Sequence, residues 1–161
     1  MGTLKEDLQK QREWIIKALN SSNYKADGTI ESLKEIDRFF DEEKKAGGIL
    51  DRPKVGSILF GISAYVGEVA IKEVGGEWIT DDDDLKGEIN IAIKLKNGAM
   101  IWPAHKVLNR YHNGEEDNLY YYMCDVCKKE IGKVMTGEEF IKMQKKKENR
   151  LTSLIKKIIG K

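Results

Sequence analysis

Hydrophobic and polar positions divide this chain of 161 residues into helix-like segments, a strand-like middle and a final helix. The central segment, residues 55–76, reads VGSILFGISAYVGEVAIKEVGG, and Glu68 is the only charged residue in its first 16 positions. A helix that is apolar or small on every side is a buried helix. The uncharged run of about 13 residues is shorter than the roughly 20 that span a bilayer. We therefore expect the central helix of a soluble core.

Amphipathic patterns predict two further helices before the central one. Thr3 and Glu6 match a capping box, which opens a helix over residues 3–19 with an apolar stripe that Trp14 joins. A turn-rich loop follows, and a second helix is expected over residues 30–46, where a glycine pair ends it.

The middle of the chain changes to the pattern of strands. Residues 88–95 alternate isoleucine and leucine with polar or small residues, as in a half-buried strand. Asn97-Gly98 is a hairpin signal, so residues 99–102 are expected to return as the partner strand. Residues 77–80 and the run LYYYM at 119–123 complete the predicted strands. The order of helices, strands and helix indicates an α+β fold with a small antiparallel sheet.

A second capping box at Thr136 and Glu139 predicts a long basic amphipathic helix over residues 136–160. Residues 135–161 carry 8 Lys+Arg against 3 Asp+Glu, a balance of +5, whereas residues 1–134 carry 20 against 24, a balance of −4. We expect this helix to dock on the protein's own core, with a partner or a lipid surface as alternatives. The basic positions lack interleaved aromatic residues, so nucleic-acid binding is not expected. The whole chain, 1–161, is predicted to be one domain.

Composition favours a soluble, cytoplasmic protein. Charged residues make up 34% of the chain, and its charged N-terminal segment predicts neither a signal peptide nor stable membrane insertion. The two cysteines, Cys124 and Cys127, agree with a reducing compartment. Their single Cys-x-x-Cys is an alternative zinc or redox site, but His105 and His112 do not have the spacing of a common zinc finger. We therefore predict no metal and no cofactor.

Glu68 is the sharpest candidate for chemistry in a sequence without the common catalytic motifs. A carboxylate in an apolar helix must be paired, protonated or turned toward a cleft. We expect Glu68 to be structural, in an ion pair with Lys106 or Arg110 or in a hydrogen bond to the end of a strand. The alternative is a cleft formed by these residues and Trp78, which would bind a small ligand or act in acid–base catalysis.

Aromatic residues late in the chain are candidates for a protein-binding surface. They are Trp102, Tyr120, Tyr121 and Tyr122. Alternate residues of a strand face opposite sides, so at least one of the three tyrosines is expected to be exposed. A protein partner is the favoured expectation, and a homodimer is an alternative.

Several motifs between residues 31 and 123 resemble a bacterial domain family of unknown function. In that family a helix ending in a Tyr-Leu-Gly-Glu-like motif precedes a Gly-Gly-x-Trp turn, a sheet and a Pro-x-x-Lys-Val segment. The matching residues are Ser32-Leu33, Ile36-Asp37, Gly61, Ala64 to Val69 (with Val66 in place of the usual leucine), Gly75 to Trp78, Pro103, Lys106-Val107, Arg110 and Asn113-Gly114.

Some relatives of that family are thought to be immunity proteins of toxin systems. The resemblance therefore implies a non-enzymatic bacterial protein that neutralises a cognate toxin by occluding it, and it supplies no catalytic residues. The mechanism would use a preformed surface built on the sheet and its loops, with electrostatic matching to the partner.

Overall fold

The computed structural model describes residues 2–128, 145–146 and 149–150. The chain divides into two compact units, Met1–Cys127 and Lys128–Lys161. The helix predicted over residues 136–160 lies outside the described residues, except for residues 145, 146, 149 and 150, whose backbone is helical. The single domain expected over residues 1–161 stays a prediction.

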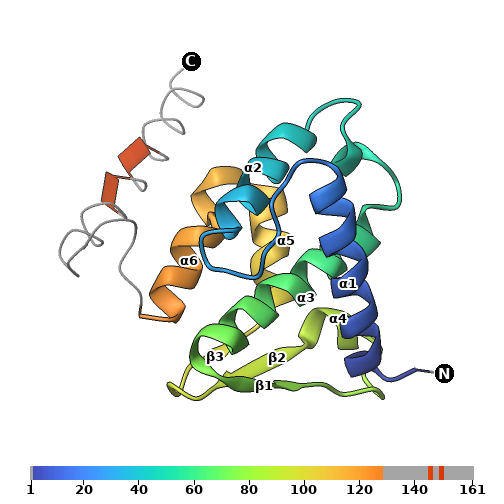
Figure 1. Ribbon diagram of the computed structural model, residues 1–161, viewed down its shortest axis with the longest axis vertical. Helices are drawn as coiled ribbons and strands as arrows, with labels where there is room; N and C mark the ends of the chain where they lie inside the picture. Colours follow the sequence, from blue (N-terminus) through green and yellow to red (C-terminus); the bar gives the residue numbers. More distant parts are fainter. Residues whose placement is uncertain (1, 129–144, 147–148, 151–161) are drawn as a thin grey trace. The chain divides into compact units, whose positions relative to one another are not determined.

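The first unit has the predicted α+β fold, in which a small antiparallel sheet with the strand order β1-β2-β3 lies along one side of a group of helices (Figure 1). In chain order its elements are α1 (Leu4–Ser21), α2 (Leu33–Glu43), the 3-10 turn η1 (Ile49–Asp51), α3 (Val55–Val74), β1 (Gly76–Ile79), α4 (Gly87–Asn90), β2 (Ala92–Leu95), β3 (Met100–Ile101), α5 (Pro103–Asn113), the 3-10 turn η2 (Gly114–Asp117) and α6 (Leu119–Val126).

The capping box at the start of α1 is confirmed. The Glu6 amide donates to Thr3 Oγ1, and the Thr3 amide donates to Glu6 Oε2, each over 3.2 Å. The apolar stripe of α1 packs on α3, where the absence of a side chain at Gly61 lets Ile15 approach closely. Trp14 was expected on this stripe but is 46% exposed, so that part of the prediction is wrong.

Helix α3 is the buried centre of the first unit, as the sequence predicts. It contacts α1, α5, α6 and the sheet, and Ile62, Ala64 and Val66 have no exposed surface (Figure 1). The helix has 20 residues and a mean hydropathy of 1.4 in its most apolar stretch, so length and composition alone would allow it to cross a membrane. More than half of that stretch, 56%, is buried in the protein, as in the core helix of a soluble protein.

The sheet forms the predicted hairpin around Asn97-Gly98, with β1 added to the other edge of β2. Trp78, Ile93 and Ile101 form one row across the three strands and face α3. The residues that alternate with them and are exposed are Glu77, Ile79, Lys94 and Met100. The sheet therefore has one face packed on α3 and one face turned outward.

The strand predicted over residues 88–95 is only half as long in the structure. Its first part is the short helix α4, in which the Asn90 amide donates to the Lys86 carbonyl over 3.0 Å. Asp84 holds this turn, because its carboxylate accepts from the Lys86 amide and from the Asn90 side chain, each over 2.9 Å. Ile89 consequently leaves the strand pattern and is exposed.

The strand predicted at LYYYM is wrong, because residues 119–126 form helix α6. Asn118 caps this helix by accepting a hydrogen bond from the Tyr121 amide over 3.1 Å. The amides of Leu119 and Tyr120 donate to the Asp37 carboxylate of α2 over 3.0 and 3.1 Å. These hydrogen bonds satisfy the free backbone amides of the first helical turn. They stabilise the helix by more than the preference of consecutive tyrosines for β-strands opposes it.

Candidate functional site

Arg110 belongs to a buried ion-pair network and does not pair with Glu68. Its side chain is 2% exposed and donates to the carboxylates of Asp37 and Asp41 over 2.8 and 2.7 Å. Burial lowers the pKa of Arg110, but the hydrogen bonds that it donates to these two carboxylates raise it, and the net shift is upward. The network joins α2 to α5 and supports α6, so the role of Arg110 visible in the structure is to hold helices together.

Lys106 also has a partner away from Glu68. Its ammonium lies 3.0 Å from the Asp117 carboxylate and 4.9 Å from the centre of the Tyr122 ring. The expected pairing of Glu68 with Lys106 or Arg110 is therefore wrong. The predicted cleft also loses both of its cations.

Glu68 pairs instead with Arg12 of α1. The two charged groups are 2.7 Å apart, and the Trp78 indole N–H donates to the same Glu68 oxygen, Oε1, over 3.0 Å. The Arg12 and Glu68 side chains are 27% and 34% exposed, so this ion pair lies at the rim of the core. Of the four residues predicted to share a cleft, the structure brings together only Glu68 and Trp78.

Gly67 and the pair Gly75-Gly76, the glycines of the two sequence motifs, lie where the sheet packs on α3. A side chain at Gly67 would lie 2.1 Å from Trp78 Cη2, so only a glycine lets the indole rest on α3 beside Glu68. Gly75, with φ of +82°, ends α3, and Gly76 lies so close to β2 that a Cβ would be 2.6 Å from the Lys94 carbonyl. These residues are explained by the packing of the sheet against α3.

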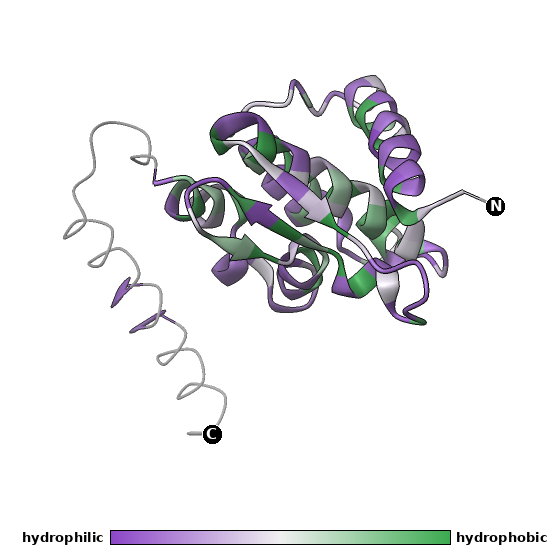
Figure 2. Cartoon of the chain, turned by 90° about the horizontal axis from the view of Figure 1, so that it is seen from below, coloured by the Kyte–Doolittle hydropathy of each residue, from purple (hydrophilic) through white to green (hydrophobic). Residues whose placement is uncertain are grey.

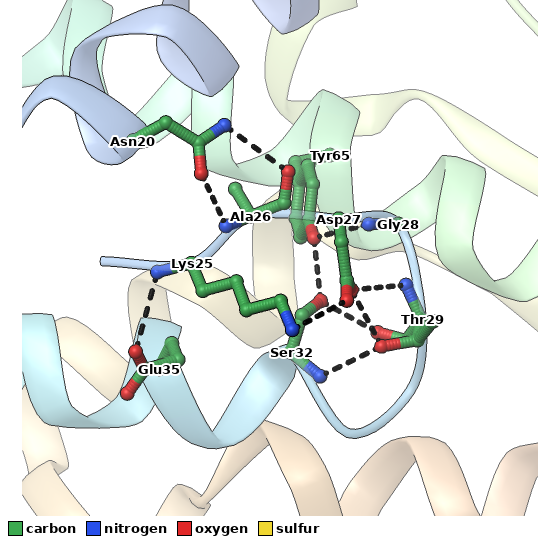
Figure 3. Close-up of polar contacts among 9 residues, drawn as sticks. All are labelled: Asn20, Lys25, Ala26, Asp27, Gly28, Thr29, Ser32, Glu35 and Tyr65. Atoms are coloured by element: carbon green, nitrogen blue, oxygen red, sulfur yellow. Dashed lines mark hydrogen bonds and ion pairs between the residues drawn. The ribbon is translucent and has the colours of Figure 1, made fainter. Parts of the chain in front are cut away.

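Tyr65 has an equally structural explanation (Figure 3). Its hydroxyl accepts from the Gly28 amide over 2.9 Å and shares a short hydrogen bond with the Ser32 hydroxyl. This contact fixes the loop between α1 and α2. The Asn20 side chain also holds the loop, because it donates to the Ala26 carbonyl and accepts from the Ala26 amide. Because residues 28–32 form this turn, α2 begins later than the predicted residue 30.

A groove with a volume of about 340 Å³ lies beside the Arg12–Glu68 pair, between α1, α3 and β1. Helix α1 contributes two cations to its lining, whereas α3 and β1 contribute two carboxylates and the indole. The residues that matter for its chemistry are Lys5, Leu8, Arg12, Glu68, Glu77 and Trp78.

The outward face of the sheet carries exposed apolar side chains. Figure 2 views the sheet from this side. Ile79 of β1 pairs with Ala92 of β2, and continuing the β2–β3 register by one residue brings Trp102 beside Ala92. Met100 lies on the same face, opposite Lys94. We call Ile79, Met100 and Trp102 the sheet patch; each is 42–45% exposed.

The three tyrosines do not extend this surface. Tyr120 is buried under Lys34, whose ammonium lies 4.6 Å from the ring centre, and Tyr121 and Tyr122 are half-buried. Burial raises the pKa of the Tyr122 hydroxyl to about 12. Trp102 is therefore the one member of the predicted aromatic surface that is largely exposed.

The cysteine pair lies at the end of α6, where Cys124 is buried and Cys127 is half-buried. Neither is in a disulfide. In the part of the chain that the structure describes, no group of three or more His, Cys, Asp or Glu side chains is placed to hold a metal ion.

Several residues at these two surfaces were missed from the sequence. Lys5 and Arg12 are seven residues apart, so they share a face of α1 with the buried Leu8. That spacing was the available signal for the groove. Ile79 and Met100 belong to strands too short for an alternating pattern to show which face they occupy.

Comparison of the chain with protein-family models, curated proteins and solved structures gives no match. The resemblance to the bacterial domain family therefore stays a prediction.

Proposed function

We propose that this protein is a non-enzymatic protein-binding module that uses the outward face of its sheet. Among the described residues there are seven large hydrophobic side chains that are exposed, and five fall within residues 79–102. Three of these five, Ile79, Met100 and Trp102, form the sheet patch, whereas Leu85 and Ile89 belong to the connection between β1 and β2. Contiguous exposed apolar surface rimmed by polar residues is typical of protein-interaction sites.

The charges around the sheet patch favour a partner with basic residues near an apolar contact. Residues 77–102 contain six acidic side chains and three basic ones. Four of the acidic residues form the run 81–84 in the connection after β1. Such a rim would speed association with a basic partner and disfavour an acidic one.

The resemblance to suspected immunity proteins makes a bacterial toxin the proposed partner, neutralised in the cytoplasm by occlusion. A rigid sheet presenting Trp102 suits this role, because tryptophan is among the residues that most often dominate binding energy at interfaces. Occlusion requires a preformed surface and no chemistry at Glu68, whose carboxylate already has two partners.

Affinity capture from the native host, with quantitative mass spectrometry, tests the proposal. Trp102→Ala should reduce capture of the partner by about tenfold or more, as expected for truncation of a central tryptophan. The matched control is Trp14→Ala on α1, since Trp14 is 46% exposed and Trp102 is 45% exposed. Loss of the partner with Trp102→Ala but not with Trp14→Ala would support binding through the sheet patch.

Two results would contradict the proposal. One is that no protein is captured in stoichiometric amount by the folded wild-type chain. The other is a partner that binds Trp102→Ala and Ile79→Asp as tightly as wild type.

A further inference from the structure

The groove between α1, α3 and β1 separates charges of opposite sign. Lys5 and Arg12 line it from α1, whereas Glu68 and Glu77 line it from α3 and β1. Arg12 and Glu68 neutralise each other across 2.7 Å. Within residues 2–128, Lys5 and Glu77 take part in no side-chain hydrogen bond or ion pair, so one cation and one carboxylate remain available to a ligand.

This balance selects against ligands that carry a single sign of charge. A simple anion would gain from Lys5 but would meet the Glu77 carboxylate, and a simple cation would gain from Glu77 but would meet the Lys5 ammonium. A dipolar ligand satisfies both sides at once. Charge-assisted hydrogen bonds to carboxylates and ammonium groups are also the stronger kind.

The rest of the lining is suited to an apolar side chain. Leu8 contributes part of the wall, and the Trp78 indole is held in place by Glu68 and by its seat on Gly67. The volume of about 340 Å³ is near the lower limit of the roughly 300–1,000 Å³ of small-molecule sites. The groove therefore has room for a small molecule.

We propose that this groove binds a small zwitterion with an apolar side chain, of the class of free α-amino acids. The ligand carboxylate meets Lys5, its ammonium meets Glu77, and its side chain lies against Leu8 and Trp78. This site is separate in its residues from the sheet patch, so the proposal does not depend on the protein-binding function.

Fluorescence of Trp78 reports on the groove directly. In full-length protein carrying Trp14→Phe and Trp102→Phe, Trp78 is the only tryptophan left. Leucine and other apolar amino acids should change its emission saturably at millimolar concentration or below. Leucinamide lacks the carboxylate and N-acetylleucine lacks the ammonium, so each should bind about three- to fivefold more weakly than leucine.

Substitutions in the same background locate the site. Lys5→Met and Glu77→Gln should each weaken leucine binding about three- to fivefold, because both side chains are exposed. Lys10→Met and Glu31→Gln remove the same charges from exposed positions outside the groove and should leave binding unchanged. Circular dichroism of every variant establishes that it is folded before its affinity is compared.

Three results would overturn the proposal. The first is that no apolar amino acid changes the emission saturably up to about 10 mM, a concentration well above the dissociation constant expected for two charge-assisted contacts. The second is equal binding of leucine, leucinamide and N-acetylleucine. The third is leucine binding that survives both Lys5→Met and Glu77→Gln.

Discussion

Replacement of Gly67 by alanine tests whether the Trp78 indole packs as closely against α3 as the structure shows. The added Cβ would lie 2.1 and 2.6 Å from two atoms of the indole and 2.7 Å from Ile93 Cδ1. Because the indole is a rigid ring, it can avoid the new methyl group only by moving away from α3. Its hydrogen bond to Glu68 Oε1 is then lengthened or lost.

The expected magnitude follows from three contributions. Alanine in a helix interior is favoured over glycine by up to about 1 kcal/mol. Overpacking a core contact costs about 1–3 kcal/mol, and a hydrogen bond to a charged group contributes about 1.5–3 kcal/mol. The Glu68 side chain is 34% exposed, so the lower end of the last range applies. Gly67→Ala should therefore lower the free energy of unfolding by about 2 kcal/mol.

Urea unfolding followed by circular dichroism measures this change, and the same helix provides the control. Gly56 also lies in α3, but a Cβ there would meet nothing within 4 Å. Gly56→Ala should raise the free energy of unfolding by up to about 1 kcal/mol through helix propensity alone. In a Trp78→Ala background, most of the cost of Gly67→Ala should disappear. If Gly67→Ala were as stable as wild type, the close seat of the indole on α3 would be refuted.

Three further outcomes follow from contacts elsewhere in the first unit. Arg110→Met should lower the free energy of unfolding by about 3–5 kcal/mol in urea titrations, because Asp37 would remain buried without its cation. Thr3→Ala should cost about 1 kcal/mol in the same assay, because it removes the capping side chain of α1. Burial raises the pKa of Tyr122 from 10.0 to about 12, so the neutral phenol is favoured in the folded state. The stability that depends on it is present below pH 10 and is lost as the pH rises toward 12; Tyr122→Phe should therefore lose less stability than wild type across that range.

Each of these outcomes has a result that would contradict it. For the buried ion pair, the control is Arg38→Met. Arg38 forms two exposed ion pairs, with Glu35 and Glu42, and each should contribute no more than about 1 kcal/mol. A loss for Arg38→Met as large as the loss for Arg110→Met would contradict the role of burial. For the cap, an unchanged urea midpoint would mean that the Thr3 hydroxyl contributes nothing. For the phenol, identical alkaline unfolding of wild type and Tyr122→Phe would refute the shifted pKa.

Sequence patterns predicted the fold correctly where the structure depends on residues that are close in sequence. The capping box at Thr3, the apolar run of α3 and the Asn97-Gly98 hairpin each depend on neighbours in sequence, and each is confirmed. The strand predicted at LYYYM failed because its hydrogen-bond acceptor, Asp37, comes from more than 80 residues earlier. A pattern within five residues contains no information about such a partner.

The candidate site was predicted only in part for the same reason. The sequence singled out Glu68 because its carboxylate interrupts an apolar helix, and Trp78 because it follows a glycine pair. Their partner Arg12 lies on the first helix, and only the packing of α1 on α3 brings it within 2.7 Å of Glu68. Rejecting Lys106 and Arg110 as partners of Glu68 would have required knowing that other carboxylates, Asp117 and Asp37, already bind them.

The contacts of Asp37 also determine when the first unit becomes complete during folding. Helix α6 has eight residues, fewer than the roughly 12–15 that an isolated helix needs to persist in water. Its first amides are held by a carboxylate of α2, which Arg110 must also reach. Contacts so distant in sequence carry a large loop-closure cost and form slowly. We therefore expect α6 to form late in folding, after α2 and α5 are in place.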